Sequence, residues 1–229
     1  LNKHQGAHPR IGAVDVIPFV PLRNTTMEEC VEFSRKFAQL FHDETKVPVY
    51  FYEESAVRPE RRNLEVIRKG QYEVLKEEII KPERHPDIGE PKLHPTAGAT
   101  VIGARKFLVA FNVNLHTQDV NIAKAIAKAI RSSSGGFSAV KAIGLELKER
   151  GMTQVSMNIV DYEKNALYRV LELIKAEAKR WGISIAETEV YGMVPAAALL
   201  ESTSYYMQIA DFDPNQVIEL RLLDLLGRD

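Results

Sequence analysis

A histidine, a proline and an arginine stand together in the stretch GAHPRIGAVDVIPFVPL, residues 6–22, directly before an apolar run. An imidazole exchanges protons near neutral pH, so His8 is a candidate general acid–base group. Pro9 favours an extended backbone at His8, and the guanidinium of Arg10 has the fork geometry that binds carboxylates and phosphates. Asp15 lies near the same strand edge and is a candidate partner of Arg10. A lone histidine is more often structural than catalytic, so these residues alone leave both roles open.

Other chemistries receive little support from the sequence. His4 and His8 have the HxxxH spacing of a helical metal site, but Gly6 and Pro9 disfavour a helix there, so no metal is expected. The chain has no phosphate-binding P-loop, no G-x-G-x-x-G pattern and no G-x-S-x-G nucleophile elbow. Cys30 falls within the apolar stripe of a predicted helix. Nucleotide binding and covalent catalysis are therefore disfavoured.

The composition is that of a globular, soluble protein, with 45% hydrophobic and 27% charged residues among 229. The 30 Lys and Arg residues nearly balance the 31 Asp and Glu residues, so neither a nucleic acid nor a membrane surface is an expected partner. The single cysteine fits a reducing compartment, and the apolar runs are far shorter than the ~20 residues of a membrane span. We expect a cytoplasmic location. Because Leu1 precedes a strand closely and is not methionine, we also expect an upstream part.

The first 103 residues are predicted to begin with a strand, a helix and a strand. Residues 13–21 are strand-like, and their prolines confine them to a sheet edge or an irregular position. Residues 24–46 are the clearest helix, because Thr26 and Glu29 have capping-box spacing and an apolar stripe recurs at helical intervals. That stripe consists of Met27, Cys30, Val31, Phe37, Leu40 and Phe41. The next segments are a strand (47–54), short helices (58–80) and a proline- and glycine-rich linker or functional loop (81–103).

The second half predicts the order β-α-β-β-α-β of a ferredoxin-like sandwich. Its expected elements are a strand (105–115), a helix (118–131), a hairpin (139–151 and 153–161), a helix closed by Gly182 (165–182) and a strand (183–192). Two further helices, within residues 195–226, are expected outside the core.

Two strands of this half separate apolar from polar side chains. Phe107, Val109, Phe111, Val113, Val155, Met157 and Ile159 alternate with Ala110, Asn112, Asn114, Gln154, Ser156 and Asn158. Helices of a ferredoxin-like fold cover one sheet face, which the apolar set fits. The other face is expected to be neutral and rich in carboxamides. It is either a solvated surface or the lining of a polar ligand cavity.

GAHPRIGAVDVIPFVPL and PTAGATVIGARKFLVAFNVNL resemble the signatures of the glutamate formimidoyltransferase (formiminotransferase) family. VPVYFYEESA, AIGLELKERGMTQVSMNIVDYEKNALYRV and ETEVYGMVPAAALL agree in the same order, so the resemblance covers nearly the whole chain. It implies two ferredoxin-like α/β subdomains with facing sheets, helices outside and a polar tunnel between. Residues 1–103, with the long loop 81–103, would be the remainder of the N-terminal subdomain, and residues 104–229 the C-terminal subdomain. The family has further strands before its HPR motif.

The resemblance also implies a reaction. Family members transfer the formimino group of N-formimino-L-glutamate to N5 of tetrahydrofolate in histidine degradation, giving 5-formiminotetrahydrofolate and L-glutamate. The implied substrates are these two small molecules, with tetrahydrofolate as co-substrate and without a metal, and the implied assembly is a homodimer. Two alternatives remain. One is a non-catalytic folate-binding module or truncated inactive homologue, and the other is a related amidino or formyl transfer to another amino acid.

Individual site residues follow from the resemblance as well. His8 occupies the position of the family's catalytic histidine. The folate-contacting segments correspond to Gly89, Glu90, Pro91, Lys92, Leu93, His94, Pro95, Thr96, Ala97 and Gly98, and to Gly135, Gly136, Phe137, Ser138, Ala139, Val140, Lys141, Ala142, Ile143 and Gly144. The loop before AVKAIG is shorter and less basic than is usual in the family, which puts single positions of the second segment in doubt. Arg10 and Lys106 are hypotheses for a substrate carboxylate, made from their chemistry alone.

Overall fold

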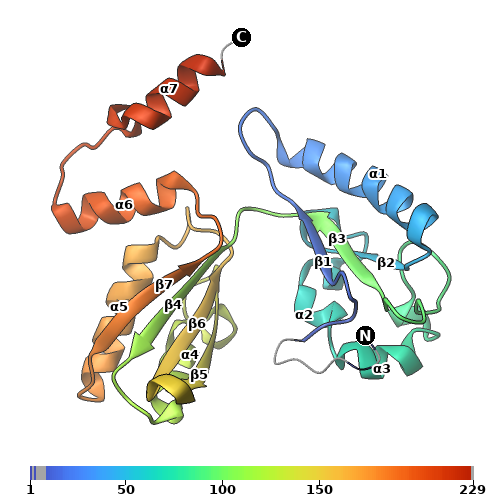
Figure 1. Ribbon diagram of the computed structural model, residues 1–229, viewed down its shortest axis with the longest axis horizontal. Helices are drawn as coiled ribbons and strands as arrows, with labels where there is room; N and C mark the ends of the chain where they lie inside the picture. The colour runs from blue at the N-terminus through green and yellow to red at the C-terminus, as the bar shows by residue number, and fades with distance from the viewer. Residues whose placement is uncertain (2, 4–8, 228–229) are drawn as a thin grey trace. The chain divides into compact units, whose positions relative to one another are not determined.

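The structure is a computed structural model that describes residues 1, 3 and 9–227. It divides into two compact units, Leu1–Lys106 and Phe107–Asp229, and each unit has its own sheet flanked by helices (Figure 1). This organisation confirms the predicted α/β class with two subdomains. No helix among the described residues is long and apolar enough to cross a membrane.

The first unit contains a sheet of three parallel strands in the order β1-β3-β2. These are β1 (Val16–Phe19), β2 (Val49–Phe51) and β3 (Thr100–Ala104). Among the described strands, β1 lies at the edge of this sheet, which is one of the two positions predicted from its prolines. The end of the predicted loop 81–103 is wrong, because residues 100–103 belong to the buried central strand. A Cβ atom at Gly103 would lie 2.3 Å from the carbonyl oxygen of Tyr52, so this glycine allows close packing within the sheet.

Helices cover both faces of this sheet. Helix α1 (Met27–Thr45) packs Ala38 against Val49, Phe51 and Ile102, whereas α2 (Leu64–Ile67) and α3 (Gln71–Glu78) cover the opposite face. The predicted capping box is confirmed by the bonds from the Glu29 N–H to Thr26 Oγ1 (3.2 Å) and from the Thr26 N–H to Glu29 Oε2 (2.7 Å). The predicted stripe of α1 is wrong at Leu40, which is 58% exposed. The buried positions include the small residues Ser34 and Ala38, which let the helix approach the sheet.

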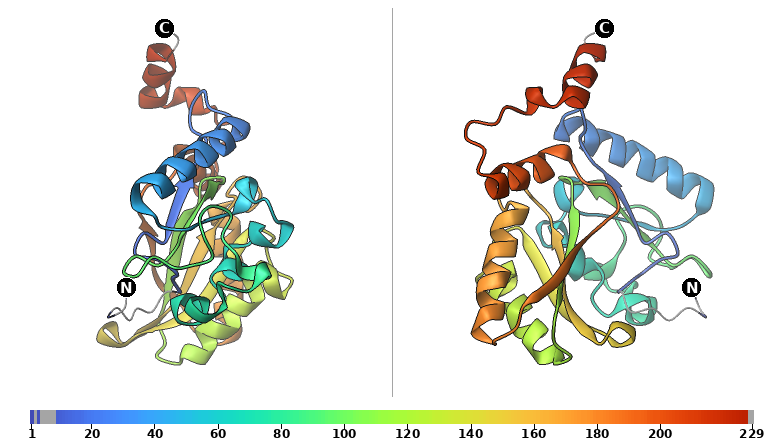
Figure 2. Two further views of the ribbon diagram at one scale, coloured as in Figure 1. Left: turned by 90° about the vertical axis from the view of Figure 1, so that its right-hand side faces the viewer. Right: turned by 60° about the vertical axis from the view of Figure 1, so that its left-hand side comes forward.

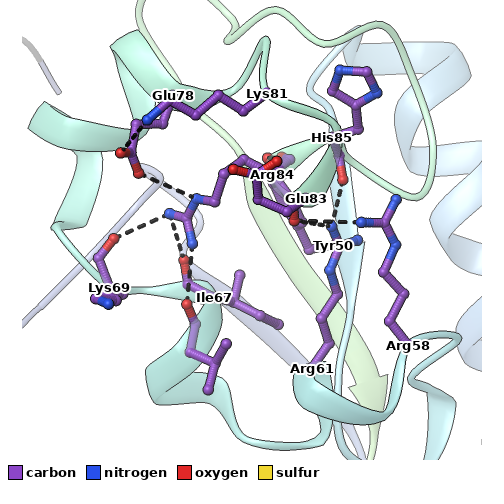
Figure 3. A network of polar contacts seen from close by, with 11 residues as sticks. Tyr50, Arg58, Arg61, Ile67, Lys69, Glu78, Lys81, Glu83, Arg84 and His85 are labelled. Carbon is purple, nitrogen blue, oxygen red and sulfur yellow. Dashed lines mark hydrogen bonds and ion pairs between the residues drawn. The ribbon is translucent and has the colours of Figure 1, made fainter.

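The start of the long loop is fixed by arginines rather than free (Figure 3). Arg61, in the 3-10 helix η2 (Pro59–Arg62), donates to the carbonyl oxygens of Glu83 (3.3 Å) and His85 (2.6 Å). Arg84, in η3 (Pro82–Arg84), donates to the carbonyl oxygens of Val66, Ile67 and Lys69. Burial raises the pKa of Tyr50, whose hydroxyl donates to the carbonyl oxygen of Arg84 at 2.6 Å. These bonds tie the loop to the sheet and to α2.

The second unit has the ferredoxin-like order that its sequence predicts, with four antiparallel strands arranged as β5-β6-β4-β7. Its elements are β4 (Val109–Leu115), α4 (Val120–Ile130), β5 (Val140–Leu147), β6 (Met152–Ile159), α5 (Leu167–Arg180), β7 (Ile185–Tyr191), α6 (Ala196–Met207) and α7 (Ile218–Leu226), with short 3-10 helices η4 (Ser132–Ser134), η5 (Lys148–Arg150) and η6 (Pro214–Gln216). Helices α4 and α5 lie on the same face of the sheet (Figures 1 and 2). The three described strands of the first unit are all parallel, so this sheet differs from the antiparallel sheet of a ferredoxin-like fold.

The core of the second unit matches the predicted apolar face. Val109, Val113, Val155 and Ile159 are completely buried and contact residues of α4 and α5. The predicted end of α5 is confirmed at Gly182, which has a φ of +67° and donates its N–H to the carbonyl oxygen of Lys179 at 3.0 Å.

Candidate functional site

His8 lies outside the described residues, but the residues that follow it are placed by backbone pairing. Residues 11–13 run beside residues 97–99, with the Ala13 N–H donating to Ala97 O (2.8 Å) and the Ala99 N–H donating to Ile11 O (3.0 Å). A Cβ atom at Gly12 would lie 1.9 Å from the carbonyl oxygen of Ala99, so only glycine allows this approach. The stretch after His8 is therefore joined to the end of the first predicted folate segment.

That first segment, residues 89–98, forms a closed loop. The backbones of His94 and Gly98 exchange two hydrogen bonds of 3.0 Å, and the Ala97 N–H donates to His94 Nδ1 at 3.1 Å. Leu93 packs against the core beneath the loop. Glu90, Pro91, Lys92, Pro95 and Thr96 are exposed. The loop therefore presents charged and polar groups on a fixed backbone.

Arg10 has a carboxylate partner within its own unit. Its guanidinium donates to both carboxylate oxygens of Glu73, at 2.7 and 3.1 Å, and to Gln71 Oε1 at 3.1 Å. The hydrogen bond that Arg10 donates to Glu73 raises the pKa of Arg10, and the same bond lowers the pKa of Glu73. Asp15, the predicted partner of Arg10, also raises the pKa of Arg10 through its charge, to a smaller extent than Glu73 does. Asp15 itself accepts from the Ile11 N–H (2.7 Å) and pairs with Arg68.

The structure does not bring Arg10 and Lys106 together. Arg10 precedes β1 and Lys106 follows β3, and these neighbouring strands are parallel. The two residues consequently lie at opposite ends of the sheet. One bound carboxylate cannot contact both side chains across the length of β3, since each strand residue advances the chain by about 3.3 Å.

The second predicted segment, residues 135–144, divides between the core and the opposite sheet face. Val140 and Ala142 are buried against the helices. A Cβ atom at Gly144 would lie 2.4 Å from the backbone nitrogen of Lys124, so this glycine lets α4 pack on β5. Lys141 and Ile143 alternate with these residues and lie on the other face. Among the residues of the predicted segment that lie in β5, those two are the positions that a ligand on that face can contact.

The face of this sheet opposite α4 and α5 carries a connected hydrogen-bond network. We call this side of the sheet the polar face and define it by six residues: Asn112, Asn114, Gln154, Asn158, Glu187 and Glu189. Asn114 is completely buried and donates to Glu187 Oε1 (3.0 Å) and Glu189 Oε1 (2.9 Å). Gln154 donates to Asn114 Oδ1 (2.8 Å) and to Glu189 Oε2 (3.0 Å). These bonds fix the carboxamides of two strands against the carboxylates of a third.

The expectation that this face is neutral is wrong. Antiparallel pairing sets Glu187 opposite Asn114 and Glu189 opposite Asn112, so β7 adds two carboxylates to the face. Arg150 pairs with Glu187 and, at 3.0 Å, with Glu189. The Arg150 hydrogen bond lowers the pKa of Glu187, and the pKa of Glu189 is lowered first by the Asn114 hydrogen bond. The face is therefore charged and internally paired.

We predict that this pairing makes the stability of the second unit pH-dependent. A carboxylate whose folded pKa lies below its ordinary value of 4.5 stabilises the fold above that value and loses this contribution as the pH falls through the folded pKa. Between about pH 5 and pH 3, the parent should therefore lose more unfolding free energy than a Glu187→Gln/Glu189→Gln variant. Urea unfolding followed by the fluorescence of Trp181, the single tryptophan, measures this. Equal pH slopes for the two proteins would contradict it.

No group of three or more histidine, cysteine, aspartate or glutamate side chains within the described part of the chain is arranged to hold a metal ion. The chemistry that the described residues offer is that of acid–base groups, hydrogen-bond donors and paired charges.

Comparisons with known proteins cover the whole of this architecture. The family model described as "Formiminotransferase domain, N-terminal subdomain" matches residues 1–105, and the model described as "Formiminotransferase domain" matches residues 110–225. Glutamate formimidoyltransferase of Streptococcus pyogenes serotype M1 is 50% identical over 224 residues, which are 97% of this chain and 75% of that protein. Glutamate formimidoyltransferase of Thermoplasma acidophilum is 45% identical over 224 residues, 97% of this chain and 74% of that protein.

A longer relative matches over a smaller share of its length. Formimidoyltransferase-cyclodeaminase of Mus musculus is 42% identical over 212 residues, which are 90% of this chain and 39% of that protein. The two family models account for both units, and the relatives align across nearly every residue of the chain. The protein therefore belongs to the formiminotransferase domain family.

Proposed function

We propose that this protein transfers the formimino group of N-formimino-L-glutamate to N5 of tetrahydrofolate, with L-glutamate as the second product. The observation that carries this proposal is the 50% identity to a glutamate formimidoyltransferase across 97% of the chain. The structure adds that the stretch after His8 is hydrogen-bonded to the end of the glycine-flanked loop 89–98, so two stretches that resemble family signatures form one local structure.

The transfer needs a group that moves protons in two steps. The N5 amine attacks the formimino carbon, and the proton that leaves N5 must be accepted. The tetrahedral adduct then breaks its bond to the glutamate nitrogen, which must gain a proton to leave as an amine. An imidazole accepts the first proton and donates the second, so one histidine at the position of His8 serves both steps without a covalent enzyme intermediate.

We assign substrate binding to residues of both units, and for Arg10 this assignment requires that Glu73 moves. Loop 89–98 and the positions Lys141 and Ile143 are proposed to contact the folate. Arg10 can hold a substrate carboxylate only if that carboxylate replaces Glu73, whose side chain is 60% exposed and can move aside. Lys106, at the other end of the sheet, would have to bind a different group. We also propose that the protein is a homodimer, that it is located in the cytoplasm and that it acts in histidine degradation.

A direct assay tests this function. Purified protein is incubated with N-formimino-L-glutamate and tetrahydrofolate, and formation of 5-formiminotetrahydrofolate is followed by absorbance, with each substrate omitted in turn as a control. We expect product only when both substrates are present. Tetrahydrofolate binding by calorimetry without any turnover would instead establish a folate-binding module that does not catalyse the transfer.

A further inference from the structure

The first unit contains a cavity of about 330 Å³ between the C-terminal end of α1 and residues 90–95. Its lining includes His42 and Lys46 from the helix end, and Glu90, Lys92 and His94 from the loop. We propose that this cavity binds the carboxylate of a glutamyl group, with Lys92 and His94 as its donors. The inference rests on the proposed function, because the folate co-substrate carries a glutamyl group and L-glutamate is the second product.

The hydrogen bonds of the two histidines determine which ring nitrogen of each carries the proton. His42 Nδ1 lies 2.8 Å from the carbonyl oxygen of Val47, which can only accept, so this nitrogen carries the proton. His94 Nδ1 accepts from the Ala97 N–H, so the proton of the neutral His94 ring is on Nε2. Neither Nε2 atom has a hydrogen-bond partner among the described residues. His94 therefore offers a donor, and neutral His42 offers an acceptor.

The charges in the lining favour an anion. Lys92 and Glu90 form no ion pair within the described residues, and the Lys46 ammonium donates to the carbonyl oxygen of Asp43 at 2.7 Å. The lining thus contains two lysines and one glutamate, an excess of one positive charge among these three residues. Hydrogen bonds from a charged ammonium to a carboxylate are stronger than neutral ones. Lys92 is thus the cation available for a bound carboxylate.

The walls of the cavity are fixed by packing. Gly89 has a φ of +94°, and a Cβ atom there would lie 2.5 Å from Cε1 of His42, so glycine lets the loop approach the imidazole ring. Leu93 anchors the loop on the core. Ligand cavities in proteins range from about 300 to 1,000 Å³. At about 330 Å³, this one fits a single glutamyl group better than a whole folate.

The experiment follows the imidazole proton resonances of His42 and His94, assigned with His42→Gln and His94→Gln variants. Three probes are titrated separately: L-glutamate, tetrahydrofolate, and tetrahydropteroate, which lacks the glutamyl group. If L-glutamate is the only probe that shifts these resonances, the free product is the source of the carboxylate. Shifts with tetrahydrofolate, but not with tetrahydropteroate, identify the folate tail. Resonances that none of the probes moves, or that tetrahydropteroate moves equally, overturn the proposal.

A lysine variant tests the donor. Lys92→Met should raise the dissociation constant of the effective probe by about 10- to 100-fold, the loss expected for a hydrogen bond to a charged group. Lys128→Met, which removes an exposed lysine of α4, should leave it unchanged. An unchanged constant in Lys92→Met overturns the assignment. Turnover is measured on the same samples to separate the two proposals. An active protein whose histidine resonances do not move refutes only the glutamyl site in the cavity. An inactive protein that binds L-glutamate there refutes only the transferase function.

Discussion

Replacing His8 by alanine is expected to lower kcat for formimino transfer by about 10²- to 10⁴-fold, the usual contribution of a general acid–base group. The loss should fall on kcat, because the proton leaving N5 and the proton reaching the glutamate nitrogen both move after the substrates have bound. Steady-state rates at saturating tetrahydrofolate measure it, and circular dichroism verifies that the variant is folded. The pH dependence of kcat should also lose the ionisation that the imidazole contributes.

The matched control removes a histidine that has no proposed role. His116 is exposed in the second unit, between β4 and α4, so His116→Ala should retain the parent's kcat. Parental turnover in His8→Ala would remove His8 from the mechanism. An equal loss in both variants would point to a general effect of removing an imidazole.

Replacing Asp87 by alanine is expected to destabilise the first unit by about 3–5 kcal/mol, the cost of leaving one partner of a buried ion pair unpaired. Asp87 Oδ1 lies 2.6 Å from Arg61, and the two side chains are only 5% and 4% exposed. Asp87 Oδ2 also accepts the N–H of Phe51 at 2.8 Å, so the variant leaves a strand donor unsatisfied. Urea unfolding with amide exchange read at β2 and β3 measures the loss in this unit.

An exposed pair provides the control for this stability effect. Glu32 and Lys36 are 3.9 Å apart on α1, with side chains 73% and 77% exposed, so Glu32→Ala should cost less than about 1 kcal/mol. Asp87→Asn retains an oxygen that can accept the Phe51 N–H and should be less damaging than alanine. Similar losses in Asp87→Ala and Glu32→Ala would show that burial does not amplify this ion pair.

Local sequence patterns predicted the elements whose signals lie within a few residues. The capping box at Thr26 and Glu29, the glycine that ends α5, and the alternation along β4 and β6 each combine backbone preference with one buried face. These features need no information from distant parts of the chain. The ferredoxin-like order of the second unit followed from the succession of such elements.

The errors arose where distant segments meet. Residues 100–103 were included in the predicted loop because the whole stretch 81–103 is rich in proline and glycine, yet they pair with β1 and β2 from far away in the sequence. Glu187 and Glu189 are spaced to share a strand face, which was a usable signal, but only the register with β4 shows that they join the amides. The pairing of Arg10 with Glu73 on α3 was likewise not predicted. The Arg10–Glu73 contact depends on tertiary packing, which short-range patterns do not encode.

The placement of β3 between β1 and β2 has a consequence for folding kinetics. β1 finds its sheet partner only after Thr100–Ala104 has been synthesised, whereas β5 and β6 are joined by a short turn. Contacts between distant segments form more slowly because a long loop must close first. Residues 11–13 therefore dock beside residues 97–99 in the same late step that completes the sheet. Residues 11–13, which follow His8 in the sequence, and the end of the loop proposed to bind folate thus become ordered together, and a partly folded chain would lack both.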